Sequence, residues 1–188
     1  IRRQRQMCIR DRSRNVARRL NSGVAHLLKK NNITVIKGHG RIAGSGKIAI
    51  TVKDGNTTDV TSKHTILATG ARARSLTGLE TDSEYIWTYK EAMVPQVVPA
   101  TLLVIGSGAI GMEFASFYGD LGTEVTVVEL LDRILPMEDE EISRIARKAF
   151  EDQGMKFHTS AKVTNLNRVG EVVTASIETE DGIQQLAA

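Results

Sequence analysis

The sequence has few of the residues that build disulfide-bonded or membrane-bound structures. Cys8 is the only cysteine among 188 residues, so no disulfide can form within the chain. The longest apolar run, Thr101–Ile105, has the length of a buried strand, far short of the roughly 20 residues that a transmembrane helix needs. We therefore expect no membrane role. The chain gives no sign of an oxidising compartment, which favours a cytoplasmic location.

Basic residues are concentrated at the start of the chain. Residues 1–30 contain ten Lys or Arg and one acid, while the remainder contains 15 bases and 21 acids. A basic tail on an acidic body can bind nucleic acid, but that function needs interleaved aromatic residues or a basic stripe on a defined element. Residues 1–12 show neither of these, and no helical or strand period. We interpret them as an artefact or a disordered tail and expect no nucleic-acid partner.

Residues 13–75 combine one helix with several short strands. Apolar residues recur on one helical face from Val16 to Leu28, and the helix is expected to end near Asn32. Two strands joined by a turn at residues 53–56 predict a hairpin. The sheet begins with what look like its middle strands, so we interpret this region as a partial domain with an N-terminal portion missing. Strands are predicted at residues 33–36, 48–52, 57–61 and 65–68.

The second half of the chain alternates between strands and helices, as an α/β domain does. Residues 76–99 form a connector, and Pro95 and Pro99 mark a domain boundary at its end. The strand that follows, from Leu102 to Ile105, is apolar throughout, which is typical of a parallel strand buried on both faces. Residues 100–188 are therefore expected to form a Rossmann-like, doubly wound domain, with a C-terminal truncation kept open. Helices are predicted at 110–121 and 142–150, and further strands at 124–129, 156–163 and 172–177.

One loop in this domain has the spacing of a dinucleotide-binding motif. Residues 106–111 read Gly-Ser-Gly-Ala-Ile-Gly, follow an apolar strand and open an amphipathic helix. Gly106 permits a tight turn, Gly108 lets the backbone approach a pyrophosphate, and Gly111 lets helix and strand pack closely. The free N–H groups and positive end of the helix then hold the phosphates. The alternative is a glycine turn in an α/β domain that binds no nucleotide.

Two acidic residues complete the candidate site. Glu129 ends the second strand, where its carboxylate can accept hydrogen bonds from ribose hydroxyls and would repel a 2′-phosphate. This predicts NAD rather than NADP. Glu113 lies in the first helical turn, where it either interacts favourably with the helix dipole or contacts the nicotinamide end of the cofactor.

These segments resemble the flavoprotein disulfide reductases that have two dinucleotide-binding domains. Residues 66–71, Ile-Leu-Ala-Thr-Gly-Ala, are similar to the second FAD-contacting segment of that family, and residues 106–136 are similar to its NAD domain. Residues 72–74 and 87–93 look most like the branch that oxidises dihydrolipoyl groups. The resemblance extends over about residues 13–186 and implies FAD and NAD as cofactors.

The resemblance also assigns cofactor contacts to individual residues. Those implied for FAD are Gly40, Thr69, Gly70 and Ala71. Those implied for NAD are Gly106, Ser107, Gly108, Ala109, Ile110, Gly111, Met112, Glu113, Glu129 and Val163. In the family, the counterpart of Glu113 reaches towards the flavin–nicotinamide stack.

Several parts of the family pattern are absent from this sequence. They are the first FAD motif, the redox disulfide, and the interface domain with its His–Glu pair. We therefore expect an internal fragment that has no catalytic residue and no metal site, and that is inactive alone. The resemblance implies a homodimeric parent that oxidises protein-bound dihydrolipoamide to lipoamide and reduces NAD. Its partner would be a lipoyl-bearing protein of a 2-oxoacid dehydrogenase or glycine cleavage complex.

Two other functions stay open at this point. An NADH oxidase or another NAD-dependent flavoprotein reductase would share the glycine loop and Glu129, and a C-x4-C cysteine pair in the missing part would separate it from a dithiol enzyme. A non-catalytic nucleotide-binding module would also share them. Equilibrium titration with NAD together with a flavin absorbance spectrum would distinguish that module from a piece of an enzyme.

Overall fold

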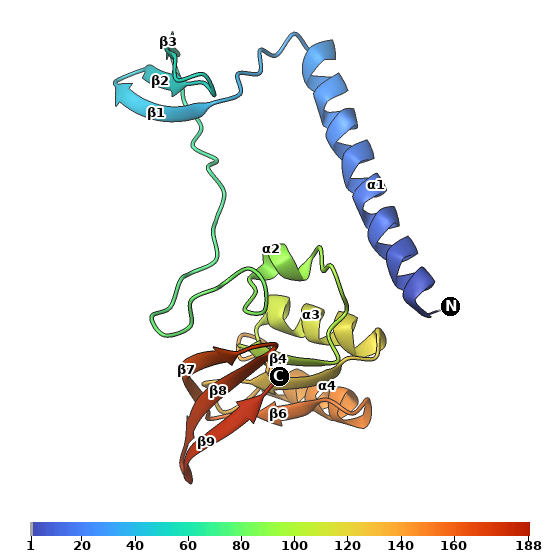
Figure 1. Ribbon diagram of the computed structural model, residues 1–188. Coiled ribbons are helices and arrows are strands. Elements are labelled where there is room, and N and C mark those ends of the chain that lie inside the picture. Colours follow the sequence, from blue (N-terminus) through green and yellow to red (C-terminus); the bar gives the residue numbers. More distant parts are fainter. Residues whose placement is uncertain (1) are drawn as a thin grey trace. The chain divides into compact units, whose positions relative to one another are not determined.

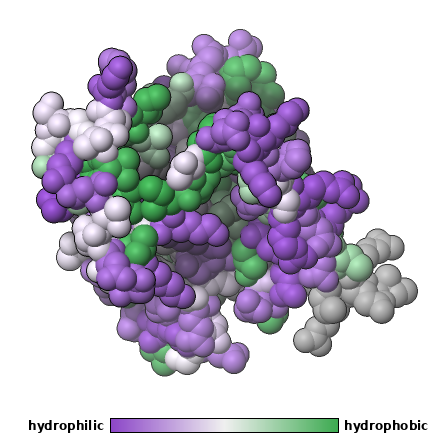
Figure 2. Space-filling model, turned by 90° about the horizontal axis from the view of Figure 1, so that it is seen from above, coloured by the Kyte–Doolittle hydropathy of each residue, from purple (hydrophilic) through white to green (hydrophobic). Residues whose placement is uncertain are grey.

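The computed structural model describes residues 2–188, which form two compact units divided between Arg72 and Ala73. Figure 1 shows both units. None of the helices in residues 2–188 is long and apolar enough to cross a membrane. Apolar residues, green in Figure 2, are exposed among hydrophilic ones on the surface drawn there.

The first unit contains one helix and one antiparallel sheet. The helix α1 spans Arg2–Lys30, and the strands are β1 (His39–Gly44), β2 (Lys47–Thr51) and β3 (Thr57–Thr61), paired in the order β1-β2-β3. The turn between β2 and β3 is closed by the Gly55 N–H, which donates to the Val52 carbonyl at 3.0 Å. The hairpin predicted from the sequence is therefore confirmed.

Three other expectations for this unit differ from the structure. Residues 33–36 and 65–68 are extended but belong to no strand, because neither segment pairs with a neighbouring strand in the described part of the chain. The helix begins at Arg2, whereas the sequence pattern predicted a start at Ser13. Arg, Gln and Met, which make up residues 2–7, are good helix formers, and extending a helix that has already formed costs little. That residues 1–12 are dispensable stays a prediction.

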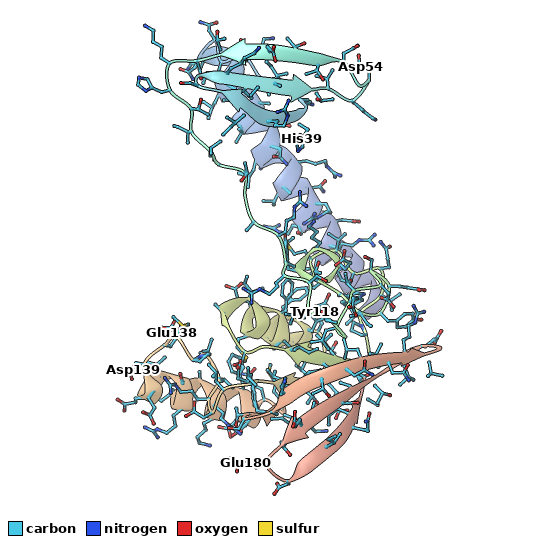
Figure 3. All side chains as sticks on the ribbon, turned by 90° about the vertical axis from the view of Figure 1, so that its left-hand side faces the viewer. His39, Asp54, Tyr118, Glu138, Asp139 and Glu180 are labelled. Atoms are coloured by element: carbon cyan, nitrogen blue, oxygen red, sulfur yellow. The ribbon has the colours of Figure 1, made fainter. Side chains whose placement is uncertain are left out.

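The second unit is built on a parallel sheet, as the sequence predicted. Its strands are β4 (Thr101–Ile105), β5 (Glu124–Val128) and β6 (Lys156–His158), in the order β4-β5-β6. The helix α3 (Ala109–Asp120) joins β4 to β5, and α4 (Glu140–Asp152) joins β5 to β6. The α4 helix starts at the N-cap Asp139, labelled in Figure 3, whose carboxylate accepts the Glu141 N–H.

The two faces of this sheet are covered differently. Val125 and Val127 of β5 pack on one side with residues from α3 and α4, including Met112 and Tyr118. Val128 points to the other side. Burial of each such valine side chain contributes roughly 1.5–3 kcal/mol to stability. Because the valines of β5 are buried on both faces of the sheet, they stabilise its packing against both neighbouring layers.

The layer on the second face is an antiparallel sheet and not a pair of helices. Its strands are β7 (Lys162–Val169), β8 (Val172–Thr179) and β9 (Gly182–Ala187), and its Ile177 packs against Val128. The predicted Rossmann-like α/β class is therefore confirmed, and the doubly wound description is corrected only in that a sheet covers this face. The strand predicted at 156–163 is broken at Ser160, whose φ of 49° turns the chain out of the parallel sheet.

Residues 78–92 lead from the division between the units to the parallel sheet. They contain the short helix α2 (Tyr89–Ala92), which Thr88 and Glu91 stabilise as a capping box. Before it, one carboxylate oxygen of Asp82 accepts the backbone N–H groups of Glu84, Tyr85 and Ile86 at 2.8–2.9 Å.

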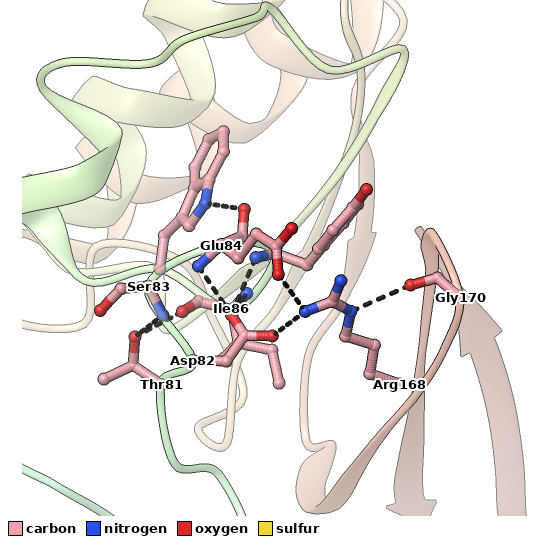
Figure 4. Close-up of polar contacts among 9 residues, drawn as sticks. Thr81, Asp82, Ser83, Glu84, Ile86, Arg168 and Gly170 are labelled. Carbon is pink, nitrogen blue, oxygen red and sulfur yellow. Dashed lines mark hydrogen bonds and ion pairs between the residues drawn. The ribbon is translucent and has the colours of Figure 1, made fainter.

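Two kinds of contact join this segment to β7: the Leu166 N–H donates to the Gly78 carbonyl at 3.1 Å, and Arg168 binds two acidic side chains. Arg168 donates from Nη1 to Asp82 at 3.0 Å and to Glu84 at 2.7 Å, and from Nε to the Gly170 carbonyl at 2.9 Å. Its guanidinium lies 3.9 Å from the centre of the Tyr85 ring. Figure 4 shows this arrangement, which we call the Arg168 clasp.

Candidate functional site

The glycine loop lies between the end of β4 and the start of α3, as the motif predicted. Gly106 has a φ of 95°, a conformation that favours glycine, and its N–H donates to the Val128 carbonyl of β5 at 2.8 Å. Gly108 is the N-cap of α3, and no side chain caps this helix end. Because the first N–H groups of a helix lack partners within the helix, the loop offers donors to an anion.

The other glycines differ in how much space surrounds them. A Cβ placed on Gly111 would lie 2.1 Å from the Gly106 carbonyl oxygen, so any side chain there would push helix and loop apart. A Cβ on Gly108 would meet nothing within 4 Å. Gly108 is exposed, which leaves its backbone open to the close approach of a ligand. This cradle fits a pyrophosphate.

Glu129 follows β5 and lies directly beside this loop. Its Oε2 accepts the Ser107 N–H at 2.8 Å and the Ser107 hydroxyl at 2.7 Å, and its Oε1 accepts the Leu131 N–H at 2.9 Å. The residue is only 8% exposed. The prediction that the acid and the glycine loop share one sheet edge is therefore confirmed.

The hydrogen bonds also control the charge of this carboxylate. Burial acts to raise the pKa of Glu129, but the bonds from Leu131 and Ser107 outweigh it, so the pKa lies below its ordinary value. Glu129 is consequently ionised at neutral pH, the state that accepts hydroxyl groups and repels phosphate.

Sequence analysis missed a second layer of contacts around the loop. The Ser107 carbonyl accepts the Leu135 N–H at 3.0 Å, and the Leu135 carbonyl accepts the hydroxyl of the buried Ser143 at 3.1 Å. Leu135 has a φ of 47°. No periodicity in the sequence indicates these contacts, because the segment between β5 and α4 has no regular structure.

The first turns of α3 place the remaining predicted residues of the loop. Met112 is 4% exposed and packs in the core, so its side chain does not face a ligand. Ala109 and Glu113 are exposed, and Ile110 is 63% exposed. These three side chains are therefore accessible from solvent at the helix end where the loop lies.

The other predicted contacts belong to other elements of the chain. Val163 of β7 packs with Val128 between the two sheets of the second unit. In the first unit, Gly40 lies in β1 opposite Ile50, and Thr69–Ala71 form an exposed extended segment in which Gly70 has a φ of 76°. No hydrogen bond joins Gly40 to residues 69–71 in the described part of the chain.

The groups around residues 106–135 are suited to binding a ligand through hydrogen bonds and charge. They combine helix N–H donors for an anion with one buried, ionised carboxylate for hydroxyl groups. Among residues 2–188, no group of three or more His, Cys, Asp or Glu side chains is placed to hold a metal ion.

Comparison with known proteins gives consistent results. The profile of the family described as pyridine nucleotide-disulphide oxidoreductase matches residues 2–187. The dihydrolipoyl dehydrogenase of Rhizobium etli is 47% identical over 94% of this chain and 40% of its own length. The dihydrolipoyl dehydrogenase of Zymomonas mobilis is 48% identical over 91% of this chain and 37% of its own length.

Solved structures show the same relationship. LpdA from Mycobacterium tuberculosis superimposes with a TM-score of 0.87 and 29% identity, over 95% of this chain and 40% of that protein. The chain thus spans about two fifths of the length of these relatives.

Proposed function

Because this chain belongs to the pyridine nucleotide-disulphide oxidoreductase family, we propose that it contributes the NAD site and part of the FAD site of a dihydrolipoyl dehydrogenase. The observation that carries the proposal is the position of Glu129, whose buried carboxylate is bonded to the loop that follows β4. An acid held there accepts ribose hydroxyls next to the loop that receives the pyrophosphate.

Specific residues would hold each cofactor. Within the loop Gly106–Gly111, the N–H groups at the N-terminus of α3 would bind the NAD pyrophosphate, and Glu129 would bind the adenosine ribose. Ala109, Ile110 and Glu113 would line the path beyond the phosphates, with Met112 and Val163 supporting from the core. NAD supplies the terminal electron acceptor. Gly40 and Thr69–Ala71 would contribute backbone contacts to FAD, as the family resemblance implies.

The reaction proposed for the whole protein is the oxidation of protein-bound dihydrolipoamide to lipoamide with reduction of NAD. The names of the two bacterial relatives support it. The partner would be a lipoyl-bearing protein of a 2-oxoacid dehydrogenase or glycine cleavage complex, and the parent a cytoplasmic homodimer. This chain's part in the reaction is binding, since no catalytic residue is assigned to it.

Two glycine substitutions test the site because the structure gives them different surroundings. Gly108→Ala places a methyl group in open space, so folding should be retained while binding of NADH falls by at least tenfold. Gly111→Ala places it 2.1 Å from a carbonyl oxygen, so the thermal midpoint itself should fall, by an overpacking cost of about 1–3 kcal/mol. NADH fluorescence titration and thermal unfolding of both variants measure the two effects.

The exposed glycine at position 55 provides a control. Gly55 lies in the β2–β3 turn, and a Cβ there meets nothing within 4 Å. Gly55→Asn, a residue that tolerates the positive φ of 87° at this position, should leave NADH affinity unchanged. If Gly108→Ala binds NADH as tightly as the unmodified chain, the pyrophosphate does not pass over this loop and the proposed site is wrong.

A further inference from the structure

The carboxylate of Glu129 is largely occupied by the protein's own donors. A carboxylate has about four lone-pair positions. Ser107 fills two positions on Oε2, through its N–H and its hydroxyl, and the Leu131 N–H fills one on Oε1. The Leu130 N–H also interacts with this carboxylate and helps to lower its pKa, so at most one position remains for a ligand. The sequence alone allowed two ribose hydroxyls at this acid, whereas the structure leaves a place for one at most.

The Ser107 hydroxyl is the donor that gives Oε2 its second hydrogen bond, whereas Oε1 accepts one from Leu131. Ser107 is completely buried, and its hydroxyl donates only to Glu129. Its backbone is fixed independently, since its carbonyl accepts the Leu135 N–H at 3.0 Å. The hydroxyl is thus a fixed point against which the Glu129 carboxylate is oriented. The N–H of Ser107 is also committed to Glu129, so this residue does not serve the phosphate as the family motif suggested.

We propose that Ser107 is a positioning residue that sets cofactor specificity through Glu129. Its hydroxyl hydrogen-bonds Oε2 and so fixes the orientation of the Glu129 carboxylate, with Oε1 directed to the ribose. The fixed carboxylate would then remain close enough to repel a 2′-phosphate. The inference rests on the proposed function, in which Glu129 receives the ribose. Discrimination between NAD and NADP should then depend on Ser107 as well as on the acid.

The test is a double-mutant cycle on the full chain, with NADH and NADPH as fluorescent probes. Ser107→Ala should weaken NADH binding severalfold and lower the NADH-to-NADPH affinity ratio by about tenfold, a change that corresponds to 1.4 kcal/mol. In a Glu129→Ala background, the same Ser107→Ala substitution should have no further effect on the affinity ratio. Ser107 is proposed to act on the cofactor only by orienting the Glu129 carboxylate, which this background lacks.

A matched control separates positioning from a general loss of stability. Thr123 is also buried, and its hydroxyl donates to the Pro99 carbonyl at 2.8 Å, at the opposite end of β5. Thr123→Val removes one buried hydroxyl, as Ser107→Ala does, and should lower the thermal midpoint without changing the ratio. A ligand-free readout is the pKa of Glu129 followed by carboxyl NMR, which should rise in Ser107→Ala and stay unchanged in Thr123→Val.

The outcomes distinguish this inference from the function on which it rests. If Glu129→Ala leaves NADH binding unchanged, or the unmodified chain binds no NADH at millimolar concentration, the proposed NAD site is wrong. If Glu129→Ala weakens binding but Ser107→Ala shifts the ratio equally in both backgrounds, or not at all, only the positioning role is overturned.

Discussion

At the scale of single residues, Glu129 has two roles: it is the proposed contact to the ribose, and it accepts hydrogen bonds from buried donors of the protein. Its carboxylate accepts three hydrogen bonds from Ser107 and Leu131 while remaining 8% exposed. Removing it would leave buried donors without an acceptor, which costs about 1–3 kcal/mol for each such group. Substitution at this position is therefore expected to affect stability as well as binding.

Glu129→Ala should weaken NAD binding by about ten- to hundredfold, because a charge-assisted bond to one ribose hydroxyl contributes roughly 1.5–3 kcal/mol. The same change should relax discrimination against NADP, and Glu129→Arg should favour NADP because guanidinium pairs well with phosphate. Affinities for both cofactors, measured by titration, check this. An unaltered NAD-to-NADP ratio in Glu129→Ala would mean that the ribose lies elsewhere.

Tyr118 is a second residue whose environment makes a measurable prediction. It is fully buried in α3, and its hydroxyl donates to the Ala92 carbonyl at 2.7 Å. Figure 3 labels it. Tyr118→Phe leaves that carbonyl without its donor, so unfolding at neutral pH should be easier by about 1–3 kcal/mol.

The difference in the free energy of unfolding between the unmodified chain and Tyr118→Phe should depend on pH. Burial raises the pKa of Tyr118 from 10.0 to about 12, so above pH 10 the unfolded chain loses its phenol proton while the folded chain keeps it. Native stability therefore falls between pH 10 and 12, whereas Tyr118→Phe has no phenol to titrate. Denaturant unfolding of both proteins across this range should show the gap closing. A constant gap would contradict the burial of the phenol.

At the scale of elements, the Arg168 clasp joins segments that are far apart in the sequence. It connects β7 to Asp82 and Glu84, which lie before α2. Exposed ion pairs usually contribute no more than about 1 kcal/mol, and the Arg168 and Asp82 side chains are 30% and 29% exposed. The expected role is local ordering and not a large share of the stability.

Arg168→Met should therefore accelerate amide exchange at Glu84, Tyr85 and Ile86 with only a small change in thermal midpoint. Arg168→Lys keeps the charge but loses the planar fork and the stacking on Tyr85, and should give an intermediate exchange rate. Hydrogen exchange followed by mass spectrometry measures this. Unchanged exchange in Arg168→Met would show that Asp82 orders the segment without the arginine.

The elements that sequence analysis predicted well are those with an internal pattern. β4 was predicted because it is an unbroken apolar run, and α3, β5 and α4 because their apolar residues repeat with the period of a helix or a strand. Residues 33–36 and 65–68 have a strand-like composition but no pairing partner, and a strand exists only when a neighbour accepts its hydrogen bonds. β9 was missed because Gly182–Ala187 has no such pattern, and its pairing with β8 forms it.

At the scale of the whole molecule, the two units differ in how much they bury. Between residues 8 and 72, Ala49 is the only buried residue. In the second unit, two clusters around Val127 and Val128 form the core on either side of the parallel sheet. Protection against amide exchange increases with such burial, so β1–β3 should exchange well before β4 and β5.

Deleting residues 1–12 should leave the thermal midpoint of the second unit unchanged, because these residues belong to the first unit and have no apolar period with which to join a core. The helix would then begin at Ser13, where the apolar period starts. Calorimetry of the shortened chain measures this. A midpoint lower by several degrees, roughly 1 kcal/mol for a domain of this size, would show that these residues stabilise the fold.

The sequence by itself determined the parallel sheet, the glycine loop and the acid that follows β5. These depend on local rules: hydrophobic period, backbone freedom at glycine, and the short distance between adjacent strand ends. Only the tertiary structure decided which atoms those residues use. The hydrogen bonds from Ser107 to Glu129 and from Arg168 to Asp82 depend on side-chain rotamers and on the path of irregular segments. Composition and spacing do not specify these features, because they result from packing between residues distant in the chain.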